Sequence, residues 1–305
     1  MRKDGFLKSL AVVAMLLVAV DVGFGLLFDR LFLGLPLRDK IPSTLCHRHS
    51  DSPEVLLIGS SRCHHHYDAA LLRDALSGVW GEEVSIYNFG LDGVYVNSSL
   101  CAIESMLERY SPRLIVLDVG SHEFDTSYRN TVAIASPLYW HDKVVKRYIN
   151  EANCVNKVVM LSSLYRYRDA MPFRMGEVYL TGSDSLLGYL PLQETMDTMV
   201  VYPKGPTEEE FVADTVVERS FRRVMALCLR KGVPVIVVDS PRYCPADNSN
   251  YVRQLCASCD VPFIDFYDTD FFNSHPELFY EPAHLNAQGA SCFTALLSEK
   301  LRGVL

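Results

Sequence analysis

The segment EVLLIGSSRCHHHYD, which runs from Glu54 to Asp68, decides the fold. Its apolar run ends at Gly59 and is followed by two serines, an arginine and three histidines. A short run that is apolar at every position is typical of a strand buried on both faces. The polar cluster after it has two interpretations: an ordinary strand-to-helix turn, or a nucleophile placed at the end of a buried strand.

Four further apolar runs resemble the first one and predict buried strands at residues 84–90, 113–120, 233–240 and 261–267. Segments with helical apolar spacing alternate with these runs: Tyr67–Leu76, Ser98–Arg109, Phe211–Arg230 and Asn250–Ala257. This alternation is typical of a parallel sheet covered by helices on both faces. The sequence therefore predicts an α/β domain with a five-stranded parallel sheet.

The N-terminal segment differs from the rest of the chain. Ser9–Phe28 is a 20-residue apolar stretch that contains one charge, Asp21, and a bilayer core requires about 20 apolar residues. Arg2, Lys3 and Lys8 precede it, so the positive-inside rule predicts a cytoplasmic N-terminus. We interpret the segment as an uncleaved signal anchor, because no clear A-x-A-like cleavage site follows. A cleaved signal peptide and a helix buried in the globular domain are the alternatives.

These features predict three parts of the chain. Residues 1–30 form a cytoplasmic tip and transmembrane signal anchor, residues 31–52 form a linker, and residues 53–305 form the main domain. That domain carries an insertion at 124–210, too long for an ordinary connection. The main domain is expected outside the cytoplasm, either periplasmic or at the cell surface.

The insertion has two interpretations, a lid over the carboxyl edge of the sheet or a peripheral subdomain. Tyr165, Arg166 and Tyr167 suggest a polar-aromatic surface for a carbohydrate.

Composition narrows the class of partner and cofactor. A formal charge of −8 without a Lys/Arg-rich block argues against a nucleic-acid partner. Nine cysteines leave at least one thiol unpaired, and Cys256 and Cys259 form a single C-x-x-C, which supports a zinc site only weakly. The adjacent His64, His65 and His66 point in different directions and have no ligand-spaced carboxylate nearby, so we expect no metal and no cofactor.

The strand ends carry a serine, an acid and a histidine in that order. Ligands of an open parallel sheet bind outside the carboxyl ends of its strands. Ser61 follows the first strand, and Glu281 and His284 lie three residues apart beyond the fifth. A serine becomes a useful nucleophile when a histidine takes its proton, and a carboxylate fixes the tautomer of that histidine.

These blocks resemble the SGNH/GDSL hydrolase superfamily over most of residues 54–300, apart from the insertion. The resemblance implies the SGNH hydrolase fold, a flavodoxin-like three-layer sandwich. The G-D-S block is matched by Gly59-Ser60-Ser61, which implies that Ser61 is the nucleophile and that its N–H helps form the oxyanion hole. The D-x-x-H block is matched from Glu281 to His284, so Glu281 replaces the usual aspartate.

The two middle blocks of the family supply the remaining oxyanion donors. The glycine N–H of the second block maps best to Gly93, with Gly90 nearby. The third block, commonly G-x-N-D, is matched by residues 120–123, where His122 takes the place of the oxyanion asparagine. A neutral imidazole can donate one hydrogen bond there. Arg62 is a candidate for binding an anionic group of the substrate, with a surface or helix-capping arginine as the alternative.

Three functions remain open at this point. The leading one is a membrane-anchored serine esterase or O-acyltransferase that acts on ester-linked acyl groups of cell-envelope glycans, beside a multi-spanning acyltransferase in some arrangements of the family. The alternative is a degenerate domain that binds a glycan or a membrane acyltransferase partner. A cytosolic esterase with a misassigned anchor is the third.

Overall fold

The computed structural model describes residues 2–33, 52–168, 186–197, 212–243 and 249–305. Five parallel strands form one sheet in the order β2-β1-β3-β4-β5. Their bounds are β1 Val55–Ile58, β2 Ile86–Asn88, β3 Leu114–Asp118, β4 Val235–Asp239 and β5 Phe263–Asp265. The strand order is that of flavodoxin-like sheets, so the predicted α/β fold is confirmed, with each strand lying inside its predicted run.

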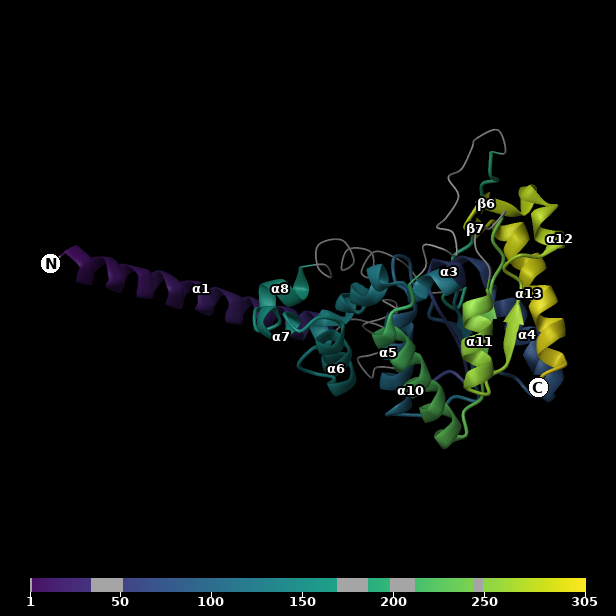
Figure 1. The fold of residues 1–305 in the computed structure, drawn as a ribbon, viewed down its shortest axis with the longest axis horizontal. Coiled ribbons are helices and arrows are strands. Elements are labelled where there is room, and N and C mark those ends of the chain that lie inside the picture. The colour runs from purple at the N-terminus through teal and green to yellow at the C-terminus, as the bar shows by residue number, and fades with distance from the viewer. Residues whose placement is uncertain (1, 34–51, 169–185, 198–211, 244–248) are drawn as a thin grey trace.

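Helices cover both faces of this sheet (Figure 1). Side chains along β1 alternate between two cores: Leu56 and Ile58 face one, and Val55 and Leu57 face the other. The helices of the first core are α5 Val96–Leu107, α10 Thr215–Lys231 and α11 Asn250–Ser258. Those of the second are α4 Ala69–Trp80, α12 Asp270–Asn273 and α13 Ala287–Arg302. The sheet is therefore the middle of three layers.

Helix ends follow the local sequence signals. Asp68 caps α4 by accepting hydrogen bonds from the N–H groups of Ala70 and Leu71, and Asp214 caps α10 in the same way. Gly232 ends α10 in the left-handed region at φ 66°, where a residue without Cβ is favoured. The helix α10 starts later than its apolar spacing predicts, because Asp214 supplies the cap that the spacing alone does not reveal.

The N-terminal helix α1, Arg2–Leu33, extends away from the body of the protein (Figure 1). Within the described residues it is the one helix long and apolar enough to cross a membrane, over Gly5–Arg30. The helix continues past residue 30, the predicted boundary of the anchor. Most of the predicted linker at 31–52 lies outside the described residues.

The insertion divides into parts with different positions. The short helix η1 leads into the insertion, and the first part of the insertion contains the helices η2, α6, α7 and α8, which pack beside α5 and α1. Their bounds are η1 Ser121–Phe124, η2 Thr126–Leu138, α6 Lys143–Ala152, α7 Asn156–Val159 and α8 Ser163–Tyr167. A later part, residues 186–197, lies near the carboxyl edge, where Leu190 N–H donates to the His64 carbonyl. Residues 169–185 and 198–211 lie outside the described part.

The predicted carbohydrate surface on α8 is wrong. Arg166 and Tyr167 are buried, at 5% and 1% exposure. The Tyr167 hydroxyl donates to the Asp29 carboxylate of α1, and Arg166 donates to the Met160 carbonyl. These side chains hold the insertion to α1 and do not face the carboxyl edge of the sheet.

None of the seven described cysteines is in a disulfide. Cys256 is buried in α11 and Cys259 caps the C-terminus of that helix. Burial raises the pKa of the Cys256 thiol to about 12, which makes it a poor thiolate ligand or nucleophile. The C-x-x-C therefore belongs to the packing of α11 before β5.

Candidate active site

Ser61 stands at the first position of α3, Ser61–His66, immediately beyond the carboxyl end of β1. The turn needs the glycine before it, because a Cβ on Gly59 would lie 2.8 Å from the Asp118 carbonyl oxygen and from the Cys63 Cβ. Ser60 is buried, and its hydroxyl donates to Glu123 at 3.4 Å. Ser61 is half-buried, so of the two serines it is the one at the surface of the turn.

His284 connects Ser61 to Glu281. Its Nε2 lies 2.6 Å from the Ser61 Oγ, and its Nδ1 forms a short hydrogen bond with the Glu281 carboxylate. Glu281 ends β6, Phe279–Glu281, and His284 begins β7, His284–Leu285. The two residues pair across this antiparallel hairpin. The predicted contact between acid and ring is therefore present, on a β-hairpin in place of a single turn.

Glu281 is held as a carboxylate. Burial raises the pKa of Glu281, but hydrogen bonds from His284 and from the Ala283 N–H, at 3.1 Å, outweigh it and the pKa falls below its usual range. A charged carboxylate at Nδ1 keeps the proton on that nitrogen and leaves Nε2 free to accept one from Ser61. The row Ser61–His284–Glu281 thus has the geometry of a serine nucleophile with its base.

His66 supports this row from behind. The Leu285 N–H donates to His66 Nε2 at 3.0 Å, and His66 Nδ1 lies 3.0 Å from the Ser240 hydroxyl. Burial, followed by the charges of His284 and Arg62, lowers the pKa of His66 well below its usual range. A neutral His66 therefore fixes β7, and with it the ring of His284, against α3.

The two candidate glycines of the second block have different surroundings. Gly90 N–H donates to the Asn88 side-chain oxygen at 2.8 Å, and a Cβ there would lie 2.2 Å from the backbone nitrogen of His64. Gly90 is thus a close-approach position. Gly93 is exposed, with φ 72° and open space at its Cβ position. Of the two, Gly93 is the one whose N–H remains a candidate oxyanion donor.

His122 lies in the short helix η1, beyond the carboxyl end of β3. A Cβ on Gly120 would lie 3.0 Å from His122 Nδ1 and 2.7 Å from a guanidinium nitrogen of Arg62. Burial and the charges of Arg62 and Arg242 lower the pKa of His122 to about 3. The ring is therefore neutral, and the nearby cation favours a lone pair on the buried Nδ1. That tautomer places the single N–H on Nε2, which can then donate one hydrogen bond.

Arg62 does not line a substrate site, which corrects its predicted role. It is 4% exposed and lies among three carboxylates, at 2.8 Å from Asp239, 3.5 Å from Glu123 and 3.9 Å from Asp118. It also donates to the Ser240 carbonyl at 3.0 Å. These contacts tie α3 to the ends of β3 and β4, so Arg62 positions the residue next to it.

One cation cannot balance three charged carboxylates in this buried cluster. Burial raises the pKa of Glu123 to about 7, against the opposing effect of Arg62, and burial also raises the pKa of Asp239 well above its usual range. Buried oxygens of Asp118, Glu123 and Asp239 have no hydrogen-bond partner among the described residues. The cluster therefore holds protons as well as charge.

Sequence reasoning missed Arg242. Its charge lowers the pKa values of both His122 and Glu281, so the guanidinium lies near both ends of the proposed site. It is half-buried and follows β4 by three residues. The segment DSPRY at that strand end was the available signal, since the carboxyl ends of parallel strands share one edge.

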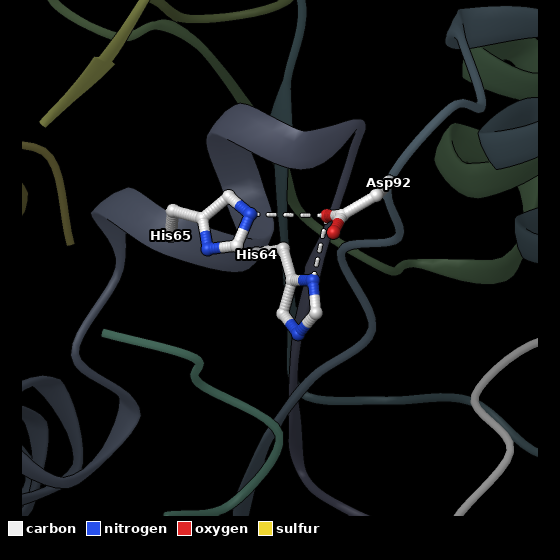
Figure 2. Close-up of side chains that lie close together, drawn as sticks. All are labelled: His64, His65 and Asp92. Carbon is white, nitrogen blue, oxygen red and sulfur yellow. Dashed lines mark hydrogen bonds and ion pairs between the residues drawn. The ribbon is translucent and has the colours of Figure 1, made fainter. Parts of the chain in front are cut away.

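His64, His65 and Asp92 form a cluster (Figure 2), and the ring of His65 lies 5.4 Å from that of His284. Asp92 Oδ1 is 2.8 Å from His64 Nδ1 and 3.2 Å from His65 Nε2. The carboxylate partner that the sequence did not reveal is thus Asp92, which precedes Gly93. It ties the loop that carries Gly93 to the helix that begins with Ser61.

These three side chains are the candidate ligands for a divalent cation among the described residues. His65 Nδ1 lies 2.7 Å from the Leu190 carbonyl, so it donates there, and Nε2 then faces the Asp92 carboxylate. Asp92 is half exposed, at 53% of its side chain, so the geometry does not require an ion.

Comparison with known proteins shows similarity to solved structures only. No family model matches the chain, and no curated protein matches it. Solved structures are similar to the chain, and one of them is that of a "putative lipolytic protein of G-D-S-L family" from Desulfitobacterium hafniense DCB-2. The match covers 83% of this chain and 99% of that one, at 10% identity and a TM-score of 0.38. The chain is thus distantly similar to a G-D-S-L protein over most of its length, and its site must be interpreted from its own geometry.

Proposed function

We propose that this chain is a membrane-anchored serine ester hydrolase or O-acyltransferase of the SGNH type. The observation that carries the proposal is the hydrogen-bonded row of Ser61, His284 and Glu281, with a 2.6 Å contact between the proposed nucleophile and base. These three residues come from the end of β1 and from a hairpin more than 200 positions later in the chain. That separation makes a chance alignment of nucleophile, base and orienting acid a poor explanation.

The first half of the reaction transfers an acyl group to the serine. Ser61 Oγ attacks the ester carbonyl carbon and gives its proton to His284 Nε2. The Ser61 N–H, the Gly93 N–H and His122 Nε2–H are the proposed donors to the oxyanion. Collapse of the tetrahedral intermediate breaks the ester C–O bond, and the leaving alcohol takes the proton from His284.

The second half releases the acyl group. A water molecule, or a hydroxyl of an acceptor, gives a proton to His284 and attacks the acyl-serine. Ser61 then leaves and recovers its proton from His284. Hydrolysis and acyl transfer differ only in which nucleophile reaches this carbonyl, and residues 186–197 border the site where that choice is made.

The substrate and location follow from the anchor and are part of the proposal. A helix of membrane-spanning length, with basic residues before it, favours a catalytic domain outside the cytoplasm. The chemistry accessible there is acyl esters on cell-envelope glycans, and a multi-spanning acyltransferase is a candidate partner. Arg242, near the site, is the cation we propose for contact with an anionic or polar group of the substrate.

The test is covalent labelling of full-length protein in membranes with a fluorophosphonate probe. We expect the label on Ser61 in the wild-type protein and none in Ser61→Ala. Ser60→Ala is the matched control, since its hydroxyl is turned to Glu123, and it should keep the label. Folded wild-type protein that resists labelling would refute the enzyme proposal, and a label on Ser60 would show that the nucleophile is misassigned.

A further inference from the structure

The C-terminal third of α1 packs against α8. The Asp21 carboxylate accepts hydrogen bonds from the Ser162 hydroxyl at 2.7 Å and from the N–H groups of Ser163 and Leu164 at 2.9 and 3.0 Å. One helix turn later, Gly25 is buried, and a Cβ there would lie 2.2 Å from the Ser163 hydroxyl oxygen. The absence of a side chain at Gly25 therefore lets the Ser163 side chain pack directly against the backbone of α1.

Aromatic contacts continue the same interface. The Phe24 and Phe28 rings stack at 4.1 Å, and Phe28 lies 5.7 Å from the ring of Tyr167. Asp29 accepts from the Tyr167 hydroxyl and lies 3.5 Å from His141 Nε2. This end of α1 is thus held to the insertion from Asp21 to Asp29.

The apolar length of α1 that is free of the domain, which begins after the charged residues 2–4, is too short to cross the hydrocarbon core of a bilayer. Residues 5–20 are exposed, and at 1.5 Å per residue these roughly 16 residues span about 24 Å. A hydrocarbon core is about 30 Å thick. The apolar span itself runs to Arg30, and Leu26 and Leu27 are exposed on the docked part of α1. A bilayer that covers the whole span must therefore reach the level of α8.

The segment from the N-cap of α7 to α8 exposes apolar side chains at this level. Val155, Val158, Leu161 and Leu164 recur every third residue and are 57%, 68%, 64% and 47% exposed. Figure 1 shows α7 and α8 beside the end of α1 that enters the body of the protein. We name these four residues the apolar ridge. Clustered exposed apolar side chains of this kind mark a contact surface.

Trp140 adds an aromatic residue that suits a membrane interface. It is 48% exposed, and the Lys146 ammonium lies 4.2 Å from its ring. Its neighbour His141 is the residue that contacts Asp29 of α1. Tryptophan next to a cation is typical of the headgroup level, where one side of the ring is wet.

We propose that the apolar ridge is a second membrane contact, which lies in the interface of the same bilayer that α1 spans. The proposal rests on the anchored topology of the proposed function. Its occupant is lipid, because the ridge continues the exposed apolar surface of α1 and because the free length of α1 leaves the ridge at the bilayer surface. Interfacial helices bury their apolar side chains about 5–10 Å into the boundary between headgroups and acyl chains, and we expect the apolar ridge to occupy the same level.

The test places a tryptophan on the ridge and measures its quenching by lipid. Full-length protein with Trp80→Phe and Trp140→Phe receives Val158→Trp, and it is reconstituted as one copy per nanodisc of phosphatidylcholine and phosphatidylglycerol. Leu10→Trp in α1 reports on the anchor. Leu229→Trp is the matched control, because Leu229 is 78% exposed on α10, away from α1.

Brominated phosphatidylcholine should quench Val158→Trp at least about twofold more than Leu229→Trp, with Leu10→Trp also quenched. Leu161→Trp should behave in the same way if Val158→Trp does not fold. Quenching at position 10 but not on the ridge would overturn the inference and leave the anchor intact. Each disc holds one copy of the protein and otherwise only lipid. A ridge that is shielded only in larger assemblies would therefore contact a second copy or another membrane protein, and that result would also overturn the inference. No quenching at position 10 would refute the anchored topology as well.

Discussion

Ser61 and Arg62 are neighbours in sequence but belong to opposite environments. Ser61 is half-buried and meets His284 at 2.6 Å, on a hairpin that contacts solvent. Arg62 is 4% exposed and meets carboxylates from β3, β4 and η1. The first turn of α3 thus has one side for chemistry and another for attachment to the sheet.

The row of Ser61, His284 and Glu281 and the buried cluster around Arg62 differ in their rigidity. The outer row can exchange protons, because Glu281 is kept charged and His284 stands between it and Ser61. The inner cluster holds charge and protons in a place that no substrate enters, and a broken buried pair costs several kcal/mol. Changes in the outer row should therefore alter rates, whereas changes in the inner cluster should alter stability.

The largest effect is expected from the outer row. Ser61→Ala and His284→Ala should each reduce kcat by about 10⁴–10⁶-fold, and the double variant should be little slower than either, because the two groups act as a unit. The free energy of unfolding should change by less than about 1 kcal/mol. Ester turnover and urea unfolding in detergent measure the two quantities, and a strictly additive double variant would contradict the shared role.

The reverse pattern is expected for Arg62→Met. Removing the cation leaves the carboxylates of Asp118, Glu123 and Asp239 without their partner, so unfolding should become easier by about 3–5 kcal/mol. Arg73→Met is the control, because its ion pair with Asp74 is exposed and is worth less than about 1 kcal/mol. Urea unfolding compares the two. An Arg62→Met protein of wild-type stability with weaker substrate binding would restore the role that the sequence predicted.

His122 lies between the two environments, so substitutions there test to which of them it belongs. Its ring is neutral, with a pKa of about 3, so a donor role should survive replacement by an amide. We expect His122→Ala to lower kcat by about 10²–10³-fold and His122→Asn to retain much of the rate. Steady-state kinetics with a small ester separates kcat from KM. Equal losses in both variants would mean that the imidazole only fills space beside Gly120.

The smallest effect is a pH dependence that originates in the inner cluster. Burial raises the pKa of Glu123 from 4.5 to about 7, so the folded protein keeps a proton that the unfolded chain releases. The free energy of unfolding should therefore fall as pH rises through this window, by about 3 kcal/mol in total. Glu123→Gln should lose this slope, whereas Glu299→Gln on α13 should keep it. Urea unfolding at pH 5 and pH 8 decides, and equal slopes in both variants would contradict it.

Much of this molecule could be predicted because its signals are local. Strands that are apolar on both faces, and helices with apolar residues at helical spacing, are encoded in adjacent residues, so the sheet and its layers could be predicted from them. The positions of Ser61, Glu281 and His284 after predicted strands also indicated that these residues lie close together, because parallel strands end at one edge of the sheet. The β-hairpin that joins the last two could not be distinguished from a turn by three residues of spacing.

The misassigned residues depend on contacts between distant segments. Arg62 looked available because its partners lie 56 to 177 positions away, and a single sequence does not show which strand ends meet it. Asp92 escaped notice for the same reason, since its partners are on α3. The aromatic segment on α8 has the composition of a sugar-binding surface, but its burial is decided by α1.

The contact between Asp21 and α8 links the biogenesis of the protein to its fold. In the anchored topology proposed above, an inserted chain whose domain has not folded leaves Asp21 exposed to lipid, at a cost that is about 2.5–3.5 kcal/mol at the middle of a bilayer and falls toward its surface. When α8 forms, its N–H groups and the Ser162 hydroxyl receive the carboxylate and remove that cost. In this topology, insertion of α1 and folding of the domain thus stabilise each other, and an immature chain carries an unpaired acidic residue in its anchor until the domain is complete.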